Sequence, residues 1–137
     1  MCRKWTGALI YQYLSISPDQ VSPPLDTFAT YREYPSSPGR YRGFCGQCGS
    51  SLIWRSERES ELESCDLLLG SIDERWLVGG GFGKLLCKPS GAQHWRGNAI
   101  EGVTDFLQGG RIYLAGKEAV WTACGIIPWH LKSLLFY

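Results

Sequence analysis

The chain has 137 residues, of which 44% are hydrophobic and 20% are charged, and its formal net charge is +1. This length is typical of one domain that can bury a sizeable core. The balanced charge, with no basic run and no acidic tail, excludes a protein that binds nucleic acid or an acidic membrane surface by electrostatic attraction.

The predicted elements are mostly short strands. Seventeen glycines and seven prolines indicate many turns, and therefore β structure rather than a helical bundle. Segments rich in β-branched and aromatic residues predict strands over residues 8–16, 27–34, 41–44, 50–56 and 65–72. A loop over 17–26, a turn over 35–40 and a solvated loop over 57–64 separate them. This spacing predicts an all-β fold, as in a sandwich or a barrel.

The N-terminal segment lacks the long apolar region of a signal peptide. The longest apolar stretch near the other end, residues 119–129, is too short to span a bilayer. We therefore expect a cytoplasmic or nuclear protein, which resides in a reducing compartment. Its six cysteines are then expected to be thiols or metal ligands rather than disulfides.

The segment "GFCGQCGSSLIW", residues 43–54, contains a Cys-x-x-Cys motif formed by Cys45 and Cys48. Such a knuckle supplies half of a tetrahedral zinc site, and the flanking glycines suit the tight turn that brings backbone N–H groups to the thiolates. A thioredoxin-type redox dithiol is one alternative, but it requires the second cysteine inside a helix. The Leu-Ile-Trp run that follows predicts a strand instead. Two structural cysteines without a metal are the other alternative.

The other candidate features of the sequence give weaker evidence for a functional site. The segment "GGGFGK", residues 79–84, departs from the phosphate-binding loop pattern at both ends and indicates a flexible loop. His94 is expected to be a packed or hydrogen-bonded core residue rather than a metal ligand. Cys65, Cys87 and Cys124 lie singly within apolar segments, which predicts that their side chains are buried.

Four segments occur in a characteristic order. They are "CRKWTGAL" at residues 2–9, "FATYREYPSSPGRYRGFCGQCGSSLIWR" at 28–55, "LLLGSIDERWL" at 67–77 and "LCKPSGAQHWRGNAIEGVTDFLQGG" at 86–110. Together they resemble the glutathione-dependent formaldehyde-activating enzyme family, also called the CENP-V/GFA domain, in its fungal form. The resemblance places one such domain at residues 1–110, followed by an unmatched tail at 111–137.

The resemblance implies a small all-β, zinc-binding fold of the β-tent type with two kinds of zinc site. In the family, an early Cys-x-Cys pair and the late knuckle hold a structural zinc, and a middle motif of three cysteines holds a catalytic zinc. Cys45 and Cys48 match the knuckle, and Cys2 matches the last cysteine of the middle motif. The other cysteines of the pattern have no match here. We therefore expect their counterparts upstream of residue 1, in an N-terminal part that this chain lacks.

The activity implied by the resemblance is that of a carbon–sulfur lyase of the S-(hydroxymethyl)glutathione synthase type, which joins glutathione and formaldehyde. Zinc is the implied cofactor, and Cys2 is the implied catalytic residue as a ligand of that zinc. Arg3 and Lys4 are candidate partners of the glutathione carboxylates, because arginine binds carboxylates in a bidentate manner. A solvated basic pair is the alternative for Arg3 and Lys4. With so few of the ligands matched, impaired activity is expected.

Two further hypotheses stay open at this point, namely a non-enzymatic zinc-stabilised binding module and an inactive fragment. The expected partners are a small-molecule thiol and an aldehyde, with no nucleic acid and no membrane. Removal of an N-terminal strand would uncover a sheet edge, and the tail is apolar. Self-association is therefore an additional expectation.

Overall fold

The computed structural model describes residues 2–57, 65–79, 82–87 and 91–115. These residues belong to two compact units. The described residues up to Asp73 form the first unit, and those from Glu74 to residue 115 form the second. The Cys-x-x-Cys motif lies in the first unit.

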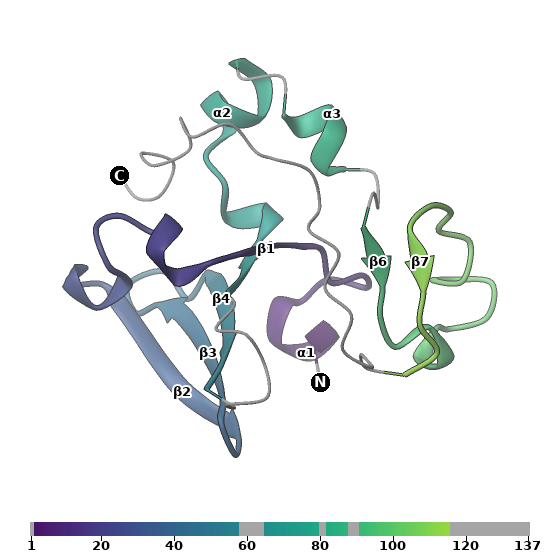
Figure 1. Ribbon diagram of the computed structural model, residues 1–137, viewed down its shortest axis with the longest axis horizontal. Helices are drawn as coiled ribbons and strands as arrows, with labels where there is room; N and C mark the ends of the chain where they lie inside the picture. The colour runs from purple at the N-terminus through teal and green to yellow at the C-terminus, as the bar shows by residue number, and fades with distance from the viewer. Residues whose placement is uncertain (1, 58–64, 80–81, 88–90, 116–137) are drawn as a thin grey trace. The chain divides into compact units, whose positions relative to one another are not determined.

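The first unit is built on a five-stranded antiparallel sheet with the strand order β1-β5-β4-β3-β2 (Figure 1). The strands are β1 Tyr13–Ile16, β2 Tyr31–Ser37, β3 Arg40–Cys45, β4 Ser51–Ser56 and β5 Cys65–Leu68. A short helix, α1 Cys2–Thr6, precedes them, and 3-10 helices occupy Pro18–Gln20, Leu25–Thr27 and Leu69–Ser71. The sheet confirms the all-β class that the sequence predicts.

The core of this unit lies where the central strands pair. Gly43 of β3 is opposite Ile53 of β4, and Ile53 is opposite Leu67 of β5. Ile53 is completely buried (0% exposed) and packs with Leu52 and Cys65. A Cβ atom at Gly43 would lie 2.7 Å from Ile53 Cγ2, so only glycine fits this close approach.

The observed strands differ from the predicted ones mainly at their ends. The first strand begins only at Tyr13, and β2 runs on to Ser37, so the predicted turn at 35–40 is shorter. Gly39 makes this turn with a φ of +66°. β5 ends at Leu68 instead of reaching 72, because a 3-10 helix follows it. Residues 58–64 of the predicted solvated loop lie outside the described residues.

A polar cluster occupies the same face of the sheet as Ile53. The Arg55 guanidinium donates to both carboxylate oxygens of Glu33, with Nε–Oε2 at 2.8 Å and Nη2–Oε1 at 2.6 Å. The Tyr31 hydroxyl donates to Glu33 Oε2 at 2.8 Å, and Arg55 lies over the ring of Tyr41 at 4.2 Å. Glu57 Oε1 accepts a further hydrogen bond from Arg55 at 2.6 Å. The cluster ties the edge strand β2 to β4.

We expect this cluster to make stability depend on pH. Burial raises the pKa of the Glu33 carboxyl, but the hydrogen bonds from Arg55 and Tyr31 outweigh burial and hold that pKa below its ordinary value of 4.5. A carboxyl group whose pKa is lower in the folded state than in the unfolded state stabilises the fold at pH values above its unfolded-state pKa. This stabilisation is lost as the pH falls through the folded-state pKa.

The substitution Glu33→Gln should therefore lower the free energy of unfolding at neutral pH, and the difference from the parent should shrink as the pH falls below 4.5. Urea denaturation at several pH values measures this difference. Glu101→Gln, at an exposed position, is the control and should leave the curve unchanged. A difference that stays constant across the pH range would contradict the assignment.

The second unit contains two short helices, α2 Glu74–Gly79 and α3 Gly83–Leu86, and a 3-10 helix at Arg96–Asn98. Its strands β6 Ala92–Gln93 and β7 Arg111–Ile112 pair in parallel (Figure 1). The sequence did not predict these helices, nor α1. The segment 79–84, expected to be a loop, contributes Gly79 to α2 and Gly83 and Lys84 to α3. Across the described ranges, no helix has both the length and the apolar character that a bilayer crossing requires.

Candidate functional site

The Cys-x-x-Cys motif forms a tight turn between two antiparallel strands. Cys45 is the last residue of β3, and β4 begins at Ser51. The Cys45 N–H donates to Ser50 O at 2.9 Å, and the Gly49 N–H donates to Cys45 O at 2.8 Å. Gly49 has a φ of +78°, a conformation that favours glycine. The predicted tight turn between two strands is therefore present, and Cys48 lies in this turn rather than in the helix that a thioredoxin-type dithiol requires.

The two thiols of the knuckle differ in their surroundings. Cys45 is half-buried against the core, whereas Cys48 is exposed. Cys48 Sγ lies 3.2 Å from the hydroxyl of Ser50. This hydroxyl, the backbone N–H of Ser50 and the Cys45 thiol together hold the pKa of Cys48 below its ordinary value of 9.0. The turn thus favours the thiolate, which is the form that binds metals.

The helix α1 contains the other predicted site residues. Cys2 is its first residue, and the structure describes the backbone of Cys2 but not its side chain. Arg3 and Lys4 are exposed. The Ser51 hydroxyl donates to the carbonyl of Trp5 at 3.1 Å, which connects α1 to the strand that leaves the knuckle. The structure therefore brings α1 to the start of β4, although the two are far apart in the sequence.

The described residues offer two of the four thiols that the predicted structural zinc site requires. Tetrahedral zinc takes four ligands, and Cys45 and Cys48 supply two thiols. Within the described ranges, no group of three or more His, Cys, Asp or Glu side chains is placed to hold a metal ion. Cys65 is buried in the core, as predicted. The described residues alone do not complete either zinc site of the resembled family.

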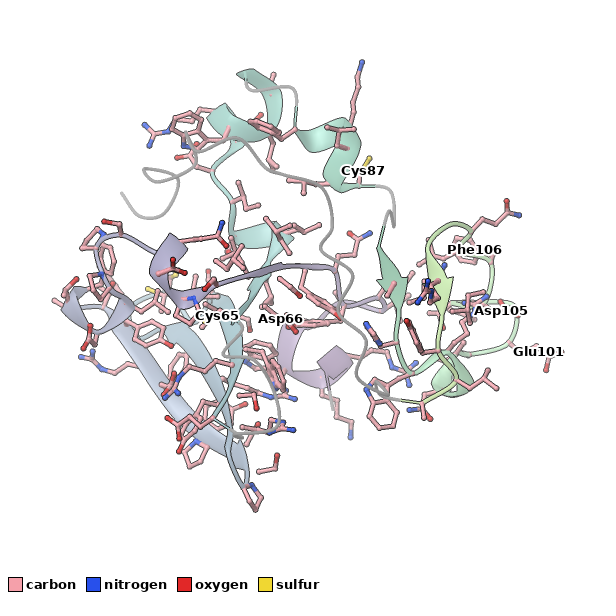
Figure 2. The ribbon with its side chains drawn as sticks, viewed as in Figure 1. Cys65, Asp66, Cys87, Glu101, Asp105 and Phe106 are labelled. Carbon is pink, nitrogen blue, oxygen red and sulfur yellow. The ribbon has the colours of Figure 1, made fainter. Side chains whose placement is uncertain are left out.

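The prediction that Cys87 is buried is wrong. Cys87 is exposed, and its sulfur projects from the end of α3 (Figure 2). The apolar residues before Cys87 form a one-turn helix without buried residues, and the Cys87 thiol donates to Lys84 O at 3.3 Å. His94 is half-buried and stacks on Tyr113 with 5.0 Å between the ring centroids, which agrees with a packed residue. Cys124 lies outside the described residues.

A cavity of about 380 Å³ adjoins the knuckle within the first unit. Its wall consists of Thr6, Ala8, Ile10, Tyr11, Gln12, Ser50, Ser51, Leu68, Gly70 and Ser71. Ser50 connects the cavity to the knuckle, because its hydroxyl contacts the Cys48 sulfur. The sequence analysis singled out the segments that contain most of these wall residues, but the sequence alone does not show that the three segments meet to form a cavity.

Comparison with models of protein families, with curated proteins and with solved structures finds no match. The resemblance to the formaldehyde-activating family therefore stays a prediction that rests on the sequence segments.

Proposed function

We propose that this chain is a zinc-dependent carbon–sulfur lyase of the S-(hydroxymethyl)glutathione synthase type, in a small zinc-binding fold of the β-tent type. The observation that carries the proposal is the turn between β3 and β4, which holds Cys45 and Cys48 together and lowers the pKa of Cys48. A glycine-rich turn between two strands suits a structural zinc knuckle, and thiolates are its ligands.

The proposed roles follow the sequence segments. Cys45 and Cys48 are ligands of the structural zinc, and Cys2 is a ligand of the catalytic zinc. The remaining ligands come from outside the described residues or from a second copy of the chain. Because zinc binding contributes to folding in small zinc domains, ligands that depart from the family pattern are expected to weaken zinc binding, and with it both activity and stability. We therefore infer that the activity is low.

The proposed substrates are glutathione and formaldehyde. Arg3 and Lys4 are exposed on α1, where they can contact a carboxylate from solution. The four cysteines whose side chains the structure describes are free thiols, as expected for the reducing compartment, such as the cytoplasm, in which we place the protein.

The proposal predicts zinc-dependent adduct formation between glutathione and formaldehyde. NMR with ¹³C-labelled formaldehyde measures the rate on the zinc-loaded chain of 137 residues. The rate should exceed that of the buffer, fall to the buffer rate in Cys2→Ser, and stay unchanged in Cys87→Ser, whose cysteine lies in the second unit. If the parent chain binds zinc but the adduct forms only at the buffer rate, the protein is instead a zinc-stabilised binding module. If the parent chain binds no zinc, it is an inactive fragment.

A further inference from the structure

The two edges of the five-stranded sheet differ in how well they are closed to a further strand. β2 lies at one edge of this sheet and β1 at the other. In an antiparallel sheet, successive residues of a strand turn their backbone N–H and C=O groups alternately to its two sides. The hydrogen bonds that an edge strand makes to its neighbour therefore show which of its residues turn these groups outward.

The outward backbone groups of β2 follow from the bond just before this strand. The Gly46 N–H donates to Thr30 O at 2.7 Å, so these two residues face each other. In the register of β2 with β3, the alternation then turns the groups of Tyr31, Glu33 and Pro35 toward the outer edge.

This edge is largely closed. The Tyr31 N–H already donates to Phe28 O at 3.0 Å, and Tyr31 O accepts a bond from Arg32 Nη1 at 2.7 Å. Pro35 has no N–H to donate. Within the described part of the chain, at most the backbone of Glu33 is left at this edge, and a single residue does not form a ladder with another strand.

The edge at β1 has none of these closing features. The Leu69 N–H donates to Gln12 O at 3.2 Å, directly before the strand. In the register of β1 with β5, the alternation turns the backbone groups of Leu14 and Ile16 toward β5 and those of Ser15 toward the outer edge. No described strand pairs with the outer side of β1. The strand contains no charged residue, no proline and no glycine, which are the residues that usually close an edge.

The side chains of β1 suit pairing with a second copy of the same strand. Leu14 and Ile16 are half-buried, and Ile16 packs against the core around Ile53. Ser15 is exposed and small. We propose that two copies of this chain pair antiparallel through β1, with Ser15 opposite Ser15 of the second copy. In this register the two serines exchange two backbone hydrogen bonds, and Leu14 lies opposite Ile16 of the second copy as an apolar cross-strand pair.

The same features limit the assembly to two copies. Two uncharged β1 strands meet without electrostatic repulsion, and the pairing is two-fold symmetric, because each copy contributes the same strand. The joined sheet then has β2 at both of its ends. Because the edge at β2 is largely closed, the association stops at the dimer instead of continuing into a fibre. The pairing needs no zinc and does not rest on the proposed function.

The substitution Ser15→Pro tests this pairing directly. It removes the outward N–H and leaves the bonds of β1 to β5 in place. Ser15→Ala is the matched control, because both variants lose the bond from Ser15 Oγ to Asp66 Oδ1 and only the proline also loses the N–H. Sedimentation equilibrium in EDTA should show a dimer for the parent and for Ser15→Ala. The dissociation constant should rise at least about tenfold in Ser15→Pro. A monomeric parent, or equal dissociation constants in the two variants, would overturn the proposal.

A second variant keeps the test decisive if Ser15→Pro does not fold. Ser15→Lys changes an exposed side chain and retains the backbone N–H, but it places two cations opposite each other at the two-fold axis. The dimer should therefore weaken, and added salt should restore part of its affinity because salt screens the repulsion. A dissociation constant equal to that of the parent would also overturn the pairing.

Zinc separates this proposal from the proposed function. A dimer that forms only with zinc and dissociates in EDTA would place the contact at the metal ligands and overturn the pairing through β1. A dimer that persists in EDTA, without zinc-dependent adduct formation, would leave the pairing in place and remove the proposed function.

Discussion

The substitution Ile53→Ala is expected to lower the free energy of unfolding by about 3 kcal/mol, within the range usual for removal of a large buried aliphatic side chain. Ile53 is 0% exposed and sits in the middle of the sheet, between Gly43 and Leu67 on the neighbouring strands. Its loss would leave a space among Leu52 and Cys65 that the paired strands cannot close easily. Urea denaturation followed by tryptophan fluorescence measures the change.

Ile112→Ala is the control, because it removes the same atoms from a side chain that is 55% exposed. It should change the free energy of unfolding by less than about 0.5 kcal/mol. Equal effects of the two substitutions would mean that the centre of the sheet is not the core of the first unit.

The substitution Gly43→Ala is the second change with a large expected effect, a loss of about 2 kcal/mol in the free energy of unfolding. A Cβ atom there would contact the Tyr31 hydroxyl and would lie 2.6 Å from Tyr31 Cε2 and 2.7 Å from Ile53 Cγ2. Tyr31 cannot move away freely, since its hydroxyl is bonded to Glu33. The added methyl group would therefore disturb both the core and the polar cluster.

Gly70→Ala is the matched control for this prediction. A Cβ at Gly70 meets no atom within 4 Å, so the same added methyl should change the free energy of unfolding by less than about 0.5 kcal/mol. Thermal denaturation of the two variants gives the comparison. A Gly43→Ala variant as stable as the parent would show that β3 and β4 are not packed as closely as the structure has them.

The sequence predicted the strands of the central sheet well and the short helices poorly. The strand β4 contains the apolar run Leu52, Ile53 and Trp54, and such a run can be recognised as a strand before the distant residues that bury it are known. The helix α1 has only five residues, too few for a periodic signal. It is held by contacts of Trp5 with Arg42 and Ser51, and these contacts exist only after folding.

The candidate site was predictable in part for the same reason. The knuckle is local, since its turn is fixed by Gly49 and by hydrogen bonds between residues 45 and 50. The cavity is not local, because its wall joins the segment after α1 with the start of β4 and the end of β5. The exposure of Cys87 was missed because an apolar stretch reads alike in a buried strand and in a short surface helix.

The measurement that tests the central claim most directly is the zinc content of the purified chain by elemental analysis, beside that of the double variant Cys45→Ser/Cys48→Ser and of Cys87→Ser. The account predicts about one zinc ion per chain in the parent and in Cys87→Ser, or about half of one where two copies of the chain share a site, and almost none in the double variant. A parent without zinc, or a double variant that retains the full amount, would contradict the assignment of the knuckle as a zinc ligand pair.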